Sequence, residues 1–146
     1  MALDKPLLKM SKSHANPKSR ILLTDTKEDI ANKIRVATTD AENRVTYDQD
    51  GRPGVANLID IVYHLNPSKA ESAQQLAAEF EGLTLRALKQ AVVESIDMHL
   101  APIRDRLQSI LSGSGREIGD AAEIGARKAS ENAKATMELV RNAIGL

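Results

Sequence analysis

The chain has 146 residues, of which 42% are hydrophobic and only 2% aromatic, and its 20 basic and 20 acidic side chains give a formal net charge of zero. This size predicts one domain whose core is built from aliphatic side chains. The lack of cysteine excludes disulfides and thiolate chemistry, no apolar run reaches the roughly 18 residues of a membrane-spanning helix, and the neutral charge argues against DNA or non-specific RNA binding.

The first twenty residues form a basic segment interrupted by two prolines, which predicts an extended, mobile stretch. Two lysines and two serines lie within five consecutive residues of it, which are Lys9, Met10, Ser11, Lys12 and Ser13. Such a group can bind a polyphosphate, because each lysine carries a compact charge with three hydrogen-bond donors. A solvated basic tail is the alternative interpretation.

The first helix is predicted to begin at Asp25 or Thr26. Thr26 and Asp29 have the spacing of a capping box. Ile30 and Ile34 then lie on one apolar face of this helix.

Two shorter helices are predicted in the middle of the chain. The turn Arg52-Pro53-Gly54 precedes a helix over residues 55–64, which Asn66-Pro67 ends. Ser68 is the predicted N-cap of the next helix, which ends at Gly82.

Two long amphipathic helices are predicted in the last third of the chain. Apolar residues recur at threes and fours from Leu85 to Ile110, with Pro102 inside this run. A second such run ends at Gly145, and its apolar positions are Ile118, Ala122, Ala126, Ala129, Ala133, Met137, Val140 and Ile144. The expected fold class is all-α: a bundle of about five helices with a long C-terminal antiparallel helix pair, preceded by an extended N-terminal loop segment.

Further motifs follow the KMSKS pentapeptide of residues 9–13 in a fixed order. They are Asn16-Pro17-Lys18-Ser19-Arg20-Ile21, Ile34-Arg35-Val36-Ala37-Thr38-Thr39-Asp40, Val45-Thr46-Tyr47-Asp48, Arg52-Pro53-Gly54-Val55-Ala56-Asn57-Leu58, Phe80-Glu81-Gly82, Leu100-Ala101-Pro102-Ile103-Arg104, Gly125-Ala126-Arg127-Lys128-Ala129 and Ala143-Ile144-Gly145-Leu146. This order and spacing resemble the C-terminal part of tryptophanyl-tRNA synthetase of the bacterial and organellar type, a class I aminoacyl-tRNA synthetase. His14 stands where members of that family often carry Asp.

The resemblance implies a division of the chain at residue 24. Residues 1–24 correspond to the KMSKS loop and a connector, and residues 25–146 to the helical tRNA-contact domain. The nucleotide-binding catalytic domain of the family lies upstream of the loop, and this chain has no counterpart of it. We therefore expect a fragment or paralogue that is not an enzyme by itself. The alternatives are the C-terminal half of a split, complementing synthetase, and a protein-interaction or self-associating module derived from a synthetase.

The resemblance also assigns roles to the loop. In the family it closes over ATP, used with magnesium, during amino-acid activation. Lys12 then corresponds to the main pyrophosphate contact and Lys9 to a supporting one, while Ser11 and Ser13 add hydroxyl or backbone contacts and Met10 sets the loop's shape. Without a nucleotide pocket opposite the loop, we expect weak, salt-sensitive ATP binding at best and no intrinsic cofactor.

The helical part resembles a domain that contacts the anticodon stem and loop, so tryptophan tRNA is the expected RNA partner. Candidate contacts are Arg35, Arg44, Arg104, Arg106, Arg116, Arg127 and Lys128. An ordinary solvated helix face is the alternative for each of them. The three histidines have no metal-like spacing, and no metal site is predicted.

Helices that normally pack on a catalytic domain are expected to leave an apolar patch exposed, which favours self-association or a protein partner. The predicted association patch is Ile21, Leu22, Leu23 and Ile34. The local sequence indicates mitochondria if the source is a eukaryote, and a bacterial cytoplasm otherwise.

Overall fold

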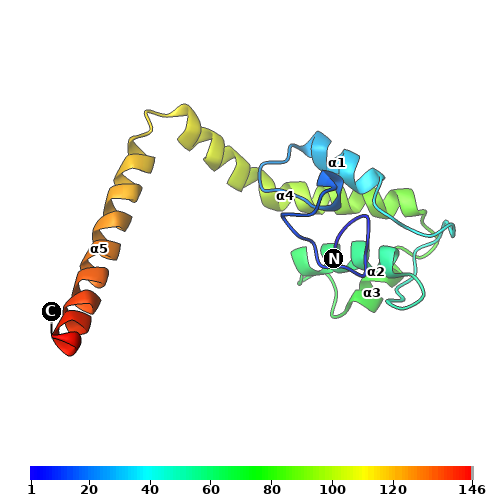
Figure 1. Ribbon diagram of the computed structural model, residues 1–146. Coiled ribbons are helices and arrows are strands. Elements are labelled where there is room, and N and C mark those ends of the chain that lie inside the picture. The colour runs from blue at the N-terminus through cyan, green and yellow to red at the C-terminus, as the bar shows by residue number, and fades with distance from the viewer. Residues whose placement is uncertain (146) are drawn as a thin grey trace. The chain divides into compact units, whose positions relative to one another are not determined.

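The computed structural model describes residues 1–145 and is all-helical over that range. Leu146, the end of the last motif quoted above, lies outside it. After a short 3-10 turn, η1 at Pro17–Ser19, five helices follow in chain order: α1 Lys27–Arg35, α2 Pro53–Leu65, α3 Ala73–Glu79, α4 Leu85–Ser112 and α5 Arg116–Ile144 (Figure 1). None of these described helices is apolar over enough of its length to cross a membrane. The predicted all-α class with two long C-terminal helices is confirmed.

The chain divides into two compact units, Met1–Arg104 and a second one from Asp105 onward. The hydrophobic core belongs to the first unit and draws on the N-terminal segment and on α1, α2, α3 and the first three turns of α4. Its most deeply buried large side chains are Leu3, Ile30, Ile34, Leu58, Ile59, Leu76 and Leu88. These are aliphatic, as the composition predicts.

The start of α1 follows the predicted capping box. The Thr26 hydroxyl accepts from the Asp29 amide, and the Asp29 carboxylate accepts from the Thr26 amide. These two bonds satisfy donors that a helix leaves unpaired at its N-terminus. The start of α3 differs from the prediction, because its N-cap is Ser72 and not Ser68. Residues 66–69 form a turn in which the Lys69 amide donates to Asn66 O, so the helix begins one turn later.

The stretch between α1 and α2 has no regular structure, and the buried side chain of Arg52 organises it. Its guanidinium donates to both Asp40 carboxylate oxygens at 2.8 and 2.6 Å, and to Thr46 Oγ1 at 2.6 Å. It also donates to two main-chain carbonyls, those of Glu42 and Arg44. All five guanidinium N–H donors therefore have acceptors, which is the condition for burying this charge at low cost.

Gly54 places α2 against the backbone that follows α1. A Cβ atom at this position would lie 2.2 Å from the carbonyl oxygen of Thr38, so no larger residue fits without moving the backbone. Pro53 at the first turn fixes the helical φ where no N–H is needed. The Arg52-Pro53-Gly54 motif thus has three roles. Pro53 begins α2, Arg52 pairs with the carboxylate and carbonyls of the preceding stretch, and Gly54 lets the backbone of Thr38 lie close to α2.

The N-terminal segment is packed, which corrects the expectation of an extended, mobile stretch. Ala2 and Leu3 are 1% and 2% exposed, and Ser19 is fully buried. The Thr38 amide donates to Leu3 O at 2.8 Å, which ties the segment to the Arg52-organised stretch. Figure 1 shows this trace beside α1 and α2.

The second unit contains the last turns of α4 and all of α5. No described residue of α5 is buried, and the antiparallel packing of the two long helices stays a prediction. Gly145 ends α5 with φ of 77°, a left-handed conformation that favours glycine, as predicted for its C-terminus.

Replacing Arg52 tests its role in organising the stretch between α1 and α2. Arg52→Gln removes the charged donor to Asp40, Thr46 and two main-chain carbonyls, and we expect it to lower the free energy of unfolding by about 3 kcal/mol in urea titrations. The Arg52 guanidinium also holds the pKa of Asp40 below 3.8. This stabilisation is therefore present above that pH and is lost as the pH falls through the folded-state pKa.

Arg44→Gln is the matched control. Arg44 pairs with Glu42 on the exposed surface, and we expect this variant to lie within about 1 kcal/mol of the parent. Equal losses in both variants would contradict the assignment.

Candidate functional site

The KMSKS residues lie in a loop whose two ends are held together. The Leu3 amide donates to Ser19 O at 2.9 Å, and the Asn16 side-chain amide donates to Asp4 Oδ2 at 2.8 Å. The bond from Asn16 lowers the pKa of Asp4, so its carboxylate accepts this bond throughout the neutral range. A surface loop closed at its base in this way is an Ω-loop, and we call residues 4–18 the signature loop.

The C-terminal half of the signature loop is held by hydrogen bonds among its own polar groups and Arg20. His14 Nδ1 accepts from the Asn16 amide at 3.2 Å, and His14 O accepts from Arg20 Nη1 at 2.8 Å. His14, the residue that departs from the family pattern, therefore takes part in holding the loop.

At the tip of the signature loop, the lysine side chains are exposed and the methionine side chain is half-buried. Lys9 and Lys12 are exposed, and neither forms an ion pair with a described acidic residue. The hydroxyls of Ser11 and Ser13 are 3.2 Å apart. Met10 is half-buried and packs against the hydrophobic core. Two lysines thus face solvent from a segment whose backbone is fixed on both sides.

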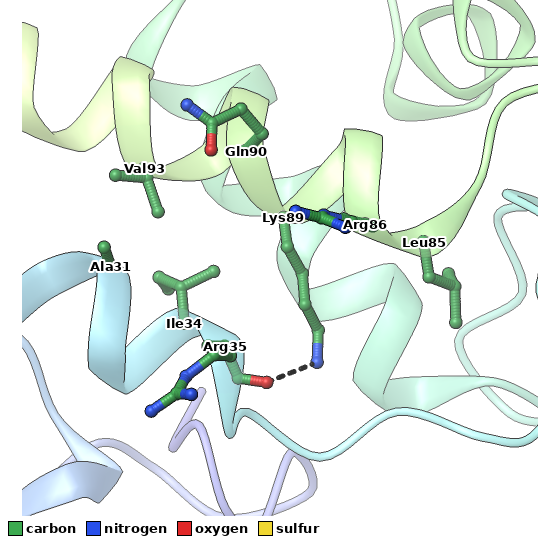
Figure 2. A pocket seen from close by; sticks show the side chains of 8 residues that line it. All are labelled: Ala31, Ile34, Arg35, Leu85, Arg86, Lys89, Gln90 and Val93. Carbon is green, nitrogen blue, oxygen red and sulfur yellow. Dashed lines mark hydrogen bonds between the residues drawn. The ribbon is translucent and has the colours of Figure 1, made fainter.

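A second feature is a groove of about 540 Å³ between α1 and α4, which we call the basic groove (Figure 2). It has an apolar floor and three cationic side chains, and none of its lining residues is acidic. The lining residues are Ala31, Ile34, Arg35, Leu85, Arg86, Lys89, Gln90 and Val93.

Lys89 joins the two helices that form the basic groove. Its ammonium group donates to Arg35 O at 3.1 Å and to Ala37 O at 2.9 Å, at the C-terminal end of α1, as Figure 2 shows for the first bond. Carbonyls there carry the negative end of the helix dipole and need donors, so a lysine is favourable. Desolvation lowers the pKa of Lys89 from its ordinary value.

Three of the predicted RNA-contacting arginines already have partners. Arg104 donates to Asp25 O and to the Asp97 carboxylate, both at 2.7 Å. Arg44 pairs with Glu42 at 2.7 Å, and Arg106 pairs with Glu117 at 3.0 Å. Arg104 is mostly buried and has a structural function, whereas Arg44 and Arg106 form exposed pairs that an RNA phosphate can replace at little cost.

The other predicted contacts are not paired in this way. Arg35 reaches only the Asn32 side chain, at 3.4 Å, and lies in the basic groove. Arg116, Arg127 and Lys128 lie on the exposed α5, without ion pairs among the described residues. Among the seven candidates, Arg35 is the one that lines the basic groove.

Arg86 and Lys89 of the basic groove were not identified from the sequence. A signal was present for Lys89, because it lies between Leu88 and Val92 on the face of α4 that enters the core. A lysine at such a position often has a buried amine with a defined acceptor. Arg86 gave no such signal, since its importance depends on the neighbouring α1.

The predicted association patch is wrong in one of its four members. Ile34 is 0% exposed and belongs to the core, because α1 turns this face toward α2 and α4. Ile21 packs partly against the same core. Leu22 and Leu23 are 37% and 58% exposed, so these two members of the predicted patch can contribute to an association surface.

Residues 1–101 match the family of class I tRNA synthetases of the W and Y type. The chain is 34% identical over 146 residues to the tryptophan–tRNA ligase of Halalkalibacterium halodurans, covering 100% of this chain and 43% of that protein. It is 35% identical over 144 residues to a mitochondrial tryptophan–tRNA ligase of Caenorhabditis elegans, covering 99% of this chain and 38% of that protein. The chain thus spans less than half the length of these relatives.

A crystal structure of tryptophanyl-tRNA synthetase from Mycoplasma pneumoniae has a similar fold. The TM-score is 0.78 at 30% sequence identity, and the match covers 100% of this chain and 43% of that chain.

Breaking the base of the signature loop tests how its tip is held. Asn16→Ala removes the donor to Asp4 and the cap of η1. We expect hydrogen exchange of the hydrogen-bonded Leu3, His14 and Ser19 amides to accelerate about tenfold, since making local opening easier by about 1.4 kcal/mol has that effect. Asn142→Ala on the exposed α5 is the control and leaves these amides unchanged. Unchanged exchange in Asn16→Ala would show that other contacts hold the loop.

Proposed function

Because the chain belongs to the family of class I tRNA synthetases of the W and Y type, we propose that it supplies the C-terminal, tRNA-contacting part of a tryptophan–tRNA ligase, together with the loop that binds ATP phosphates. The match of the whole chain to 43% of such ligases supports this proposal.

The signature loop provides the first part of this function. During activation, attack on the α-phosphate of ATP develops negative charge on the phosphoryl oxygens and on the departing pyrophosphate. Lys12 and Lys9 are exposed and have no described acidic partner, so their charges are available to stabilise it. The fixed base lets the tip move as a unit when it closes over the nucleotide.

The loop acts on ATP that is held by a nucleotide-binding domain, provided by the same polypeptide or by another. The lysines contact one side of the triphosphate only, and adenine and ribose need a separate pocket. By itself, the region from Met1 to Gly145 is proposed to hold ATP weakly through charge.

The basic groove provides the second part, and it is the observation that carries the proposal for RNA. Arg35 and Arg86 line this groove together with apolar side chains, and none of its lining residues is acidic. Single-stranded RNA loops are recognised by such combinations, because guanidinium planes stack on bases and bind phosphates while an apolar floor accommodates a base. A local site of this kind also agrees with a chain whose net charge is zero. We therefore propose that an unpaired loop of tryptophan tRNA binds there.

ATP binding is tested by calorimetry with MgATP. We expect a Kd of about 1 mM that weakens with added salt, because solvated lysines provide screened attraction only. Lys12→Ala weakens it further, whereas Lys69→Ala, far from the loop in sequence, has no effect. Sub-micromolar affinity would contradict the proposal.

Complementation tests the catalytic side. Mixing the chain with a catalytic-domain fragment of a tryptophan–tRNA ligase should give tryptophan-dependent pyrophosphate exchange that neither part gives alone. Lys12→Ala should reduce this exchange about 100-fold or more, the usual loss for removing one donor to transition-state charge. Exchange or aminoacylation by the chain alone would overturn the proposal.

RNA binding is tested by fluorescence anisotropy with tryptophan tRNA over a salt series. We expect Arg35→Ala with Arg86→Ala to weaken binding about tenfold or more and to reduce the salt slope by about 1.4, or about 0.7 for each phosphate of single-stranded RNA that the variant no longer neutralises. Lys69→Ala with Arg141→Ala is the matched control, since it removes two exposed cationic side chains that lie outside the groove. An equal loss in both pairs would show that the groove is not the RNA site.

A further inference from the structure

His14 lies directly beside the groups that are proposed above to contact ATP phosphates. The tip of the signature loop is a tight turn over residues 11–14, which the His14 amide closes by donating to Ser11 O at 3.3 Å. Lys12 and Ser13 occupy the two corner positions of this turn. The imidazole therefore follows the lysine by only two residues, at the end of the same turn.

Hydrogen bonding determines which nitrogen of the His14 ring carries the proton. Nδ1 accepts from the Asn16 amide at 3.2 Å, so in a neutral ring the proton is on Nε2. Nε2 has no hydrogen-bond partner in the described part of the chain, and it is not one of the buried unpaired side-chain atoms, which are Asp4 Oδ1 and Arg20 Nε. The ring thus carries an accessible Nε2–H donor that no described residue uses.

The main chain of His14 is fixed on both sides of this ring. The amide bonds to Ser11 O, and the carbonyl accepts from Arg20 Nη1 at 2.8 Å. Together with the Nδ1 bond, these contacts hold both the backbone and the side chain of the residue. A donor that is already held loses less conformational entropy on binding a ligand than a solvated lysine side chain does.

The charges of the signature loop favour an anion at this turn. The loop contains one acidic residue, Asp4, and four lysines, which are Lys5, Lys9, Lys12 and Lys18. An aspartate at position 14 can accept the same Asn16 amide, because Asp side chains bond to the main chain two residues on. It would also place a carboxylate beside Lys12. The histidine keeps the acceptor and replaces the negative charge with a hydrogen-bond donor.

We propose that His14 is a further phosphate-binding residue, whose Nε2–H donates to an oxygen of the polyphosphate that Lys12 contacts. This inference rests on the ATP function proposed above for the signature loop. The turn then offers one charged donor from Lys12 and one neutral donor from His14. Both recognise the polyphosphate chain and neither contacts a nucleoside, so inorganic tripolyphosphate binds at the same place as MgATP.

An NMR titration of the full chain with MgATP at about pH 8, where an ordinary imidazole is neutral, tests this role. We expect His14→Asn to raise the Kd about threefold to tenfold, the usual effect of losing one hydrogen bond. Its side-chain oxygen can still accept from the Asn16 amide, which preserves the turn. His14→Asp should raise the Kd about tenfold or more, because it adds a negative charge beside Lys12. His64→Asn on the exposed side of α2 is the control and should leave the Kd unchanged.

Lys12→Ala in the same titration separates this inference from the function on which it rests. Weaker binding in Lys12→Ala combined with parental affinity in His14→Asn would overturn the role of His14 and leave the function of the loop intact. Parental affinity in Lys12→Ala would overturn the proposed function of the loop itself, and the role of His14 with it.

Nitrogen-15 NMR of the histidine rings tests the contact directly. We expect His14 to be the Nε2–H tautomer and its Nε2 resonance to shift when inorganic tripolyphosphate is added. His99 is an internal reference for the opposite tautomer, because its Nδ1 lies 2.8 Å from Ser95 O, which can only accept. An Nδ1–H tautomer at His14, or an Nε2 resonance that tripolyphosphate leaves unchanged, would overturn the proposal.

Discussion

The five donors of the buried Arg52 guanidinium are the constraint on which the first unit depends. The stretch between α1 and α2 has neither helix nor sheet to satisfy its polar groups, and Arg52 supplies that pairing through Asp40, Thr46 and two carbonyls. Once the stretch is fixed, the backbone of Thr38 lies against Gly54 of α2 on one side and binds Leu3 on the other. The base of the signature loop is thereby joined to the helical core.

The basic residues of this chain fall into two physical classes. Arg52, Lys89 and Arg104 are at least half-buried, and their donors bind main-chain carbonyls or acidic partners, so they hold elements together. Lys12 and Arg35 are exposed and form no ion pair with the rest of the described chain. A phosphate would have to displace the existing acceptors of the first class, whereas it can bind the second class directly. The proposed nucleotide and RNA contacts are therefore drawn from exposed side chains.

The two units differ in how they are stabilised. The first has an aliphatic core and long-range hydrogen bonds, whereas α5 in the second has no buried residue. A single long helix gains little free energy without a surface to pack against, since most helical stability in proteins comes from an amphipathic face that is buried.

The sequence by itself determined the family, the all-α class and most helix boundaries, because periodicity, capping pairs such as Thr26 with Asp29, and the terminal Gly145 act within a few residues. Only the tertiary structure decided which apolar and charged groups face outward. It buried Ile34 in the core and brought Arg86 beside α1, and it closed the N-terminal segment into a loop. These outcomes depend on contacts between residues far apart in the chain, and local patterns do not specify which distant surfaces meet.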